Sequence, residues 1–411
     1  MNKFVGFMTE KVTPKLNKIT KNDWISAIQD GIMVVLPFIL VGSLISVVSI
    51  LRNLIPAMPD LSPINSYSFG LIGIFLAFLV PYNVLEKKKI EKTKLIGGLA
   101  GFGTYLMVCG LVANEEGLMT FDFARLGAGG MFTAILIGLF VSFIMVTFDK
   151  FTFFKNNETL PEFIVTWFDS MLPLAIILTI TWLFVFQIDL DIFETITGLF
   201  KPLIVGGNSI VGYTIIVFLF SFVYSFGVSP WVIWPVVAPI LYSNTATNVA
   251  LVEAGKTATQ IASYETLFAG WGAIGGLGCT LPIAVMMCFS KSKRIKTFGR
   301  ATILPSIFNI NEPLVFGLPI AFNPIMMIPM WINGLVLPLI TYTVLNMGLV
   351  AVPDRVFQLN FLPSGITTYL INEDFRGVIL WLVLIVVASL IWYPFFKAFE
   401  KQEVTLELQD N

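Results

Sequence analysis

Long apolar runs separated by short polar segments dominate the pattern along this chain. The stretches that contain no Asp, Glu, Lys or Arg are residues 31–51, 61–85, 95–114, 126–148, 170–188, 202–252, 266–290, 313–353 and 377–396. Most of them match the roughly 20 residues that a helix needs to cross the hydrocarbon core of a bilayer. The longest run breaks at "GVSPW", residues 227–231, which gives it two spans. The pattern predicts an all-α polytopic membrane protein with about ten transmembrane helices.

Composition supports this class and removes others. Of the 411 residues, 56% are hydrophobic and 12% are charged, whereas a soluble domain carries about 25% charged residues. A soluble enzyme is therefore excluded, and nucleic-acid binding lacks an extended basic surface. Histidine is absent, and Cys109, Cys279 and Cys288 lie in apolar segments without metal-ligand spacing. No metal site, disulfide framework or histidine-based mechanism is predicted.

Lysine and arginine placement predicts the orientation, because short cytoplasmic loops carry the excess of positive charge. The N-terminal segment, residues 86–94 and residues 291–300 each carry five basic residues, so both termini are expected in the cytoplasm. The first 24 residues lack the compact apolar centre of a signal peptide. Their interleaved apolar and lysine positions favour an amphipathic segment on the membrane surface, with a solvated tail as the alternative.

The polar stretches between the runs complete the predicted topology. Residues 149–170 are expected to form a cytoplasmic connection with a surface-lying helix that leads into a fifth span, while residues 244–265 and 354–376 are expected outside. The alternation of sides closes only if residues 301–330 enter and leave the membrane on the same side. That segment is therefore predicted to be a re-entrant hairpin, a backbone form tolerated where it lines a wet cavity.

Glu312 is the one charged residue between Arg300 and Asp354. A carboxylate at membrane depth costs about 2.5–3.5 kcal/mol on insertion scales, and such residues usually mark a substrate or ion path. Pro313 removes a backbone donor and disfavours helical backbone at Glu312, which frees neighbouring polar groups for binding. The alternative is that Glu312 ties down its own hairpin by accepting backbone N–H bonds.

Amide and aromatic side chains surround this carboxylate in sequence. One anion with several amides suits a neutral polyhydroxylated ligand, whose hydroxyls donate to the carboxylate and accept from the amides. Tryptophan rings could stack on a sugar, although each one alone is equally typical of interfacial packing. The predicted substrate-binding residues are Asn309, Asn311, Glu312, Asn323, Ser229, Trp231 and Trp234.

The glycines of "GWGAIGGLGCTLPI", residues 270–283, invite comparison with a phosphate-binding loop. The stretch lacks the Lys-Ser/Thr that follows in such loops, and it lies in an uncharged run. Close helix packing through small residues is the better interpretation.

The stretch "PSIFNINEPLVFGLPIAFNPI", residues 305–325, resembles the signature of enzyme IIC, the membrane component of the phosphoenolpyruvate-dependent sugar phosphotransferase system, in its lactose/cellobiose/diacetylchitobiose family. Residues 15–44, 271–283 and 375–402 also resemble stretches of that family, in the same order, so the resemblance covers most of the chain.

The resemblance implies a homodimer in the bacterial cytoplasmic membrane, with re-entrant hairpins and elevator-like motion. Residues 1–200 would form a dimerising scaffold with the amphipathic N-terminal segment, and residues 201–411 a sugar-binding transport half. The implied function is uptake of a β-linked disaccharide such as cellobiose or diacetylchitobiose. Glu312 and Asn311 would contact the sugar. A cytoplasmic IIB protein with a phosphocysteine, supplied by IIA, would phosphorylate it, so no small-molecule cofactor is implied.

One position departs from the family pattern. Family members carry a histidine where this chain has Ser229, in "SFGVSPWVIWPVV". A serine hydroxyl can form hydrogen bonds but is no useful base near neutral pH. Any catalytic role in phosphoryl transfer would rest on Glu312 as the base, which requires a pKa raised by burial. Two alternatives stay open: a permease of the same fold that transports without phosphorylation, and a non-transporting receptor or bacteriocin docking protein.

Overall fold

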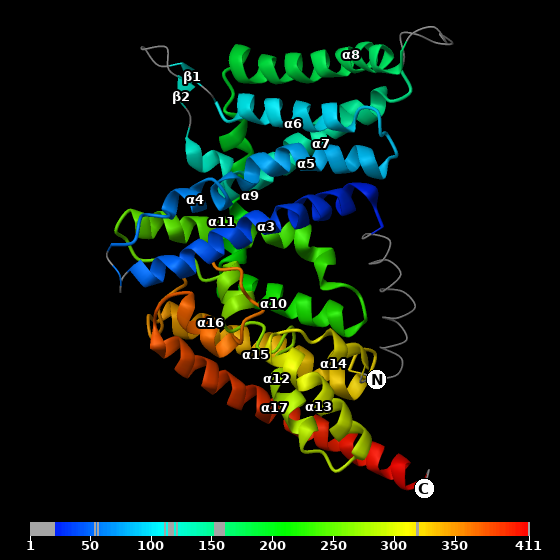
Figure 1. Ribbon diagram of the computed structural model, residues 1–411, viewed down its shortest axis with the longest axis vertical. Coiled ribbons are helices and arrows are strands. Elements are labelled where there is room, and N and C mark those ends of the chain that lie inside the picture. Colours follow the sequence, from blue (N-terminus) through cyan, green and yellow to red (C-terminus); the bar gives the residue numbers. More distant parts are fainter. Residues whose placement is uncertain are drawn as a thin grey trace. The chain divides into compact units, whose positions relative to one another are not determined.

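The computed structural model describes residues 21–52, 55, 57–110, 112–113, 119–120, 122–151, 161–317 and 320–409 (Figure 1). The predicted amphipathic segment at the N-terminus falls outside the described residues. Nearly all described secondary structure is helical, and the one strand pair, β1 (Val112–Ala113) with β2 (Met119–Thr120), has two residues a side. The prediction of an all-α fold is confirmed.

The chain forms two compact units. The N-terminal unit contains Leu61–Leu203 and the beginning of α3 (Asp23–Arg52), up to Gly42. The C-terminal unit contains Ile204 onward together with Ser43–Asp60. The scaffold and transport roles assigned to the two halves stay predictions.

The N-terminal unit is built around three helices that run side by side, α5, α6 and α7 (Figure 1). Small residues let their backbones approach closely, as is common where helices pack within a membrane. A Cβ atom on Gly101 would lie 2.1 Å from the Ala77 carbonyl oxygen, and one on Gly138 would lie 2.7 Å from Cβ of Val80. The elements of this unit are α4 (Ser62–Ser66), η2 (Phe69–Leu71), α5 (Ile72–Lys87), α6 (Lys94–Val108), η3 (Phe123–Leu126), η4 (Ala128–Gly130), α7 (Met131–Phe148), α8 (Glu162–Trp182), η5 (Leu183–Gln187) and the first part of α9 (Ile192–Gly207).

The connection predicted at residues 149–170 is different in the structure. Residues 162–170 are the beginning of α8, which continues as one apolar helix with η5 to Gln187. The prediction of a separate surface-lying helix there was wrong for the described residues. The polar positions that suggested it lie on the first turns of the helix, where Pro161 and Glu162 suit a helix start.

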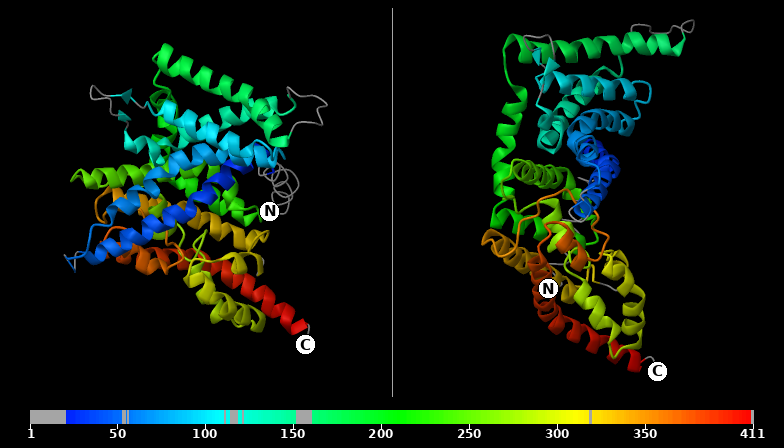
Figure 2. Two further views of the ribbon diagram at one scale, coloured as in Figure 1. Left: turned by 45° about the horizontal axis from the view of Figure 1, so that its top comes forward. Right: turned by 60° about the vertical axis from the view of Figure 1, so that its left-hand side comes forward.

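The C-terminal unit is less regular and contains several short helices between long ones. Helices α12 and α13 lie side by side, as Figures 1 and 2 show. The elements are α10 (Ile210–Ser225), η6 (Pro230–Ile233), α11 (Trp234–Glu253), η7 (Glu265–Gly270), α12 (Leu281–Cys288), α13 (Lys293–Ile307), α14 (Glu312–Gly317), α15 (Pro324–Asn346), α16 (Ser364–Leu370) and α17 (Phe375–Gln409).

The apolar run 266–290 is not a continuous helix, and its prediction as a full span was wrong. It consists of the single π-helical turn η7, an irregular stretch and the eight-residue α12. Gly275, Gly276 and Gly278 in the irregular stretch have φ of +71°, +99° and +82°, which residues with a Cβ rarely adopt. The glycines are closely packed, but the predicted packing between helices was wrong for them, because they lie in a non-helical backbone.

Six helices among the described residues are long and apolar enough to cross a membrane, or up to seven if the bent pair α9 and α10 forms one span. That pair bends by 82°. The break predicted after α10 is present, because Gly227 adopts φ +69° and η6 follows it. Several remaining apolar runs are shorter or interrupted, such as α6, so hydropathy alone does not delimit them. The polytopic membrane fold is confirmed.

Candidate functional site

A break in the helical backbone separates α13 from α14, immediately before Glu312. Asn309 has φ +61°, and Asn is among the few residues that tolerate this left-handed conformation. The N–H of Ile310 donates to the Pro305 carbonyl at 2.9 Å, and the N–H of Asn309 donates to the Ser306 carbonyl at 3.1 Å. This pair of bonds is the Schellman pattern that ends helices. The six-residue α14 is much too short to cross a membrane, which agrees with a re-entrant segment.

Asn309 joins three non-helical segments through its side chain. Its Oδ1 accepts from the N–H of Gly275 at 2.8 Å, and its Nδ2 donates to the carbonyls of Asn360 at 2.6 Å and Leu362 at 3.0 Å. The glycine-rich stretch and the segment before α16 therefore meet at this break. All three amide bonds are internal, so Asn309 shapes the site.

Asn311 is 3% exposed and makes a second set of links. Its Nδ2 donates to the Leu277 carbonyl at 2.9 Å and to Thr280 Oγ1 at 3.0 Å, while its Oδ1 accepts from the Tyr224 hydroxyl at 3.4 Å. A Cβ atom on Gly276 would lie 2.3 Å from Cγ of Asn311. The glycine is thus required for Asn311 to reach its partners.

Glu312 is the first residue of α14, and its side chain is exposed. No described residue donates a hydrogen bond to its carboxylate or forms an ion pair with it, although the Tyr224 phenol is close enough to interact electrostatically. The alternative in which Glu312 accepts backbone N–H bonds within its own hairpin therefore finds no support among the described residues. Its oxygens are free to accept from hydroxyl groups of a ligand.

Ser229 lies in the break between α10 and α11. It is exposed, and its side chain forms no hydrogen bond with a described residue. The break is closed from the other side by Phe322, whose N–H donates to the Ser225 carbonyl at 3.0 Å and whose ring packs on Gly227. The segment between α14 and α15 thus reaches the end of α10 close to Ser229 in sequence.

The two predicted tryptophans lie in different environments. Trp231 is partly exposed and stacks on Phe268 with the ring centroids 6.2 Å apart and the planes at 19°. Trp234 is fully buried and contacts the rings of Phe220, Tyr242, Tyr264 and Phe268. Only Trp231 has exposed surface to offer a ligand in this structure.

The remaining amide side chains of the apolar run 313–353 have other environments. Asn323 caps α15, since its Oδ1 accepts from the Ile325 N–H at 3.0 Å. Asn333 is 1% exposed on α15, and neither of its amide atoms has a hydrogen-bond partner among the described residues. Trp271 is fully buried and donates from Nε1 to the Gly377 carbonyl at 2.9 Å.

One polar residue of this unit escaped the sequence-based prediction. Glu265 is 0% exposed at the start of η7, although it lies in the stretch 244–265 expected outside the membrane. Much of that stretch is not solvated, because α11 continues to Glu253 and buries Asn244, Thr245 and Asn248. The i, i+4 spacing of the two asparagines on one helix face was the available signal.

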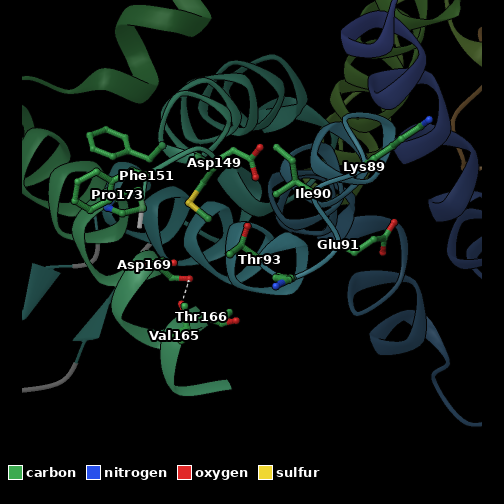
Figure 3. Close-up of a pocket in the computed structure, with 14 residues that line it drawn as sticks. Lys89, Ile90, Glu91, Thr93, Asp149, Phe151, Val165, Thr166, Asp169 and Pro173 are labelled. Atoms are coloured by element: carbon green, nitrogen blue, oxygen red, sulfur yellow. Dashed lines mark hydrogen bonds between the residues drawn. The ribbon is translucent and has the colours of Figure 1, made fainter. Parts of the chain in front are cut away.

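A separate cavity of about 290 Å³ lies in the N-terminal unit (Figure 3). Side chains from the α5–α6 connection, the end of α7 and α8 line it, among them Lys89, Lys92, Asp149 and Asp169. None of the predicted sugar-binding residues lines this cavity. Its mixed charge suits neither a neutral sugar in particular nor a metal ion, and the described residues contain no cluster of metal-ligating side chains.

Comparisons with known proteins agree on one family. Residues 29–334 match the family model "Phosphotransferase system, EIIC". The chain is 28% identical to the cellobiose-specific EIIC component of Geobacillus stearothermophilus over 100% of this chain and 97% of that protein. It is also 28% identical to the lactose-specific EIICB component of Staphylococcus haemolyticus, over 98% of this chain and 71% of that longer protein.

A solved structure shows the same architecture. The crystal structure of the transporter ChbC, the IIC component from the N,N'-diacetylchitobiose-specific phosphotransferase system, matches with a TM-score of 0.86 at 26% identity, covering 98% of this chain and 99% of ChbC. With 98% of this chain covered, the match includes residues of both units. The chain therefore belongs to the EIIC family of sugar permeases of the phosphotransferase system.

Proposed function

We propose that this permease takes up a β-linked disaccharide across the bacterial cytoplasmic membrane. Glu312 would contact the sugar, with Asn311 and Asn309 holding the helix break beside it and with Asn323, Ser229 and Trp231 around it. The observation that carries the proposal is the exposed carboxylate of Glu312, held at a helix break by amides that are themselves fully engaged. The relatives are named for cellobiose, lactose and N,N'-diacetylchitobiose, which are all β-linked disaccharides.

The chemistry of the site suits a neutral sugar. Hydroxyl groups donate to a carboxylate, and a hydrogen bond to a charged group contributes about 1.5–3 kcal/mol. The partly exposed Trp231, backed by Phe268, supplies an apolar face for the ring carbons of the sugar. Trp234 supports Trp231 from behind, with the ring centroids 5.3 Å apart.

Coupling to phosphorylation involves a partner protein. The lactose-specific relatives are EIICB components, in which the EIIC portion continues into further chain, and this supports IIB and IIA as partners here. In the transfer step, a sugar hydroxyl would attack the phosphorus of a phosphocysteine on IIB. The P–O bond forms as the P–S bond breaks, and the hydroxyl proton passes to a base. Glu312 is the candidate for that base.

A second candidate function is transport without phosphorylation. The chain contains no histidine, and Ser229 stands where the family has one. Glu312 alone would then bind the solute and take no part in group transfer. This permease would carry a sugar or another polar solute by facilitated diffusion or ion coupling.

Dimerisation and lipid contact belong to the same proposal. In the apolar part of helix α8, continued by η5, only 17% of the residues are buried within the chain, and large apolar side chains such as Phe163, Trp167 and Trp182 are exposed. An apolar face of this size needs cover from lipid or from a second copy of the chain. A homodimer formed through the N-terminal unit, with both chain termini in the cytoplasm, meets this need.

Uptake into vesicles tests the proposed function. Purified protein is reconstituted and supplied with IIA, IIB and phosphoenolpyruvate, and accumulation of labelled cellobiose, lactose and diacetylchitobiose is measured. We expect accumulation of at least one sugar as its phosphate, and Glu312→Gln is expected to weaken sugar binding by about 10- to 100-fold. Glu253→Gln, on the exposed end of α11, serves as the matched control.

The outcomes separate the two candidates. Uptake that persists without phosphoenolpyruvate, and that is lost in Glu312→Gln, favours transport without phosphorylation. If none of the sugars is bound or accumulated under either condition, the proposal of a disaccharide permease should be dropped.

A further inference from the structure

A second carboxylate, Glu265, lies in the C-terminal unit and has no counter-ion among the residues that the structure describes. It is fully buried, and no described Lys or Arg forms an ion pair with it. Arg355, two residues before its partner Phe357, is paired with Asp354 and Glu373 instead. Burying a carboxyl group without a cation is costly unless hydrogen bonds compensate. The hydrogen bonds of Glu265 therefore indicate its role.

Both oxygens of Glu265 accept hydrogen bonds from other segments. Oε2 accepts from the Thr245 hydroxyl on α11 at 2.5 Å, and Oε1 accepts from the backbone N–H of Phe357 at 3.1 Å. The carboxyl group thus holds η7, α11 and the non-helical segment 357–362 together. Glu265 is the first residue of η7, a π-helical turn of a kind that often occurs at functional sites.

The segment 357–362 connects Glu265 to the helix break before Glu312. The Tyr264 hydroxyl donates to Asn360 Oδ1 at 3.2 Å, and the Asn360 carbonyl accepts from Asn309 Nδ2 at 2.6 Å. Asn309 is three residues before Glu312. A displacement of this segment would therefore remove the contacts that hold Asn309 in its left-handed conformation.

The same turn also positions the aromatic part of the site. Phe268 in η7 is the ring on which Trp231 stacks, and it packs against Tyr264 with centroids 4.9 Å apart. Tyr264 in turn stacks on Tyr242 at 5.6 Å and 18°. Glu265 thus reaches both proposed sugar contacts, Glu312 through Asn309 and Trp231 through Phe268.

We propose that Glu265 is a positioning residue for the sugar site, which fixes segment 357–362 and η7 in the register that orients Glu312 and Trp231. This inference rests on the proposed function. Glu265 does not touch the sugar, because its side chain is fully buried, and it acts through its two acceptor oxygens.

Binding and uptake by variants of the full-length protein test this role. The probes are labelled cellobiose, lactose and diacetylchitobiose, and the sugar that the wild-type protein binds best is used. We expect Glu265→Ala to raise the Kd by about tenfold or more, because the N–H of Phe357 loses its acceptor and Thr245, whose hydroxyl also reaches the Leu241 carbonyl, is no longer linked to η7. Glu265→Gln keeps one acceptor oxygen and should restore the Kd to within about threefold of the wild type.

A purely structural role makes a different prediction. With such a role, Glu265→Ala lowers the melting temperature while the folded fraction binds the sugar with unchanged Kd. Glu265→Gln then has no loss of affinity to restore. A positioning role raises the Kd and KM more than it lowers the maximal flux at saturating sugar. Glu253→Ala, an exposed carboxylate on α11, should change none of these quantities.

The outcomes distinguish this inference from the proposed function. Unchanged Kd in folded Glu265→Ala overturns the positioning role alone, whereas a wild-type protein that binds none of the sugars overturns the proposed function and this inference with it. If Glu265→Ala does not fold, Thr245→Val, which removes one of the two donors, decides the question. Unchanged affinity in Thr245→Val would then contradict the inference.

Discussion

At the scale of single residues, polar side chains that are neighbours in sequence have different roles. The side-chain amides of Asn309 and Asn311 form hydrogen bonds with backbone and side-chain partners inside the C-terminal unit, whereas the adjacent Glu312 has an exposed carboxylate. Polar atoms with partners build a site, and polar atoms without partners are the ones available to a ligand. The two tryptophans of the site differ in exposure, since Trp231 is partly exposed and Trp234 is fully buried.

Substitution of these tryptophans should affect different quantities. Trp231→Ala removes a partly exposed ring and is expected to weaken sugar binding with little loss of stability. Trp234→Ala removes a fully buried ring and should cost about 3–5 kcal/mol of unfolding free energy. Sugar Kd and melting temperature, measured on both variants in the same detergent, test this. Equal losses of stability would show that Trp231 is also a core residue.

At the scale of elements, the ends and breaks of helices determine which groups reach the site. The Schellman turn at Asn309 ends α13. The glycines at 275, 276 and 278 have positive φ, which lets their non-helical segment pass close to that turn. Helix α17 is held at its start in a comparable way. Asp374 precedes it and accepts from the N–H of Arg376 at 3.0 Å and from the N–H of Ala351 at 2.8 Å.

The cap at Asp374 predicts a pH dependence of stability. Burial raises the pKa of Asp374, but hydrogen bonds from the Arg376 side chain, Ala351 N–H and Arg376 N–H outweigh it and leave the pKa below the ordinary value of 3.8. A lowered pKa in the folded state means that the contribution to stability is present above the unfolded pKa and is lost as pH falls through the folded one.

Asp374→Asn should therefore lower the melting temperature at pH 7. Asn keeps one acceptor oxygen for the cap but loses the second acceptor and the negative charge at the helix start, a loss of about 0.3–1 kcal/mol. The difference from the wild-type protein should shrink as the pH falls below about 4. Thermal unfolding monitored between pH 3 and pH 7 tests this, with Glu253→Gln as control. A difference that stays constant over that range would contradict the assignment of Asp374 as a charged cap.

At the scale of the whole molecule, hydropathy and charge placement predict on which side of the membrane each loop lies. The termini and the basic loop at residues 291–300 are expected in the cytoplasm, and residues 254–259 outside. The described helices agree with a polytopic protein, since six of them are long and apolar enough to cross a bilayer.

Cysteine labelling in intact cells tests this topology. In a variant with Cys288→Ser, Lys256→Cys should react with a membrane-impermeant maleimide added outside. Lys401→Cys should react only after the membrane is opened, and both lysines are exposed within the chain. The buried Cys109 and Cys279 provide the background. Labelling of Lys401→Cys from outside would reverse the predicted orientation.

The sequence by itself determined the membrane class, the family and the position of the exposed carboxylate Glu312. These properties are local, because hydropathy adds up along a stretch of chain and a lone charge stands out against apolar neighbours. Pro313 likewise indicated a break in the helical backbone near this position. The predicted place was wrong, because Glu312 is the first residue of α14 and the left-handed residue at the break is Asn309.

Only the tertiary structure decided which polar residues are engaged. The full burial of Glu265, the separation of Trp231 from Trp234 and the loss of a continuous helix at 266–290 all depend on partners distant in sequence. Phe357 donates to Glu265 across 92 residues, and Tyr224 donates to Asn311 across 87. Such bonds form when the chain folds on itself, so a reading of local pattern treats Glu265 as one more polar residue of an outer segment. The physical reason is that hydropathy depends only on the residues of one stretch and on the solvent they prefer. A hydrogen bond between distant residues depends on which segments meet in the fold.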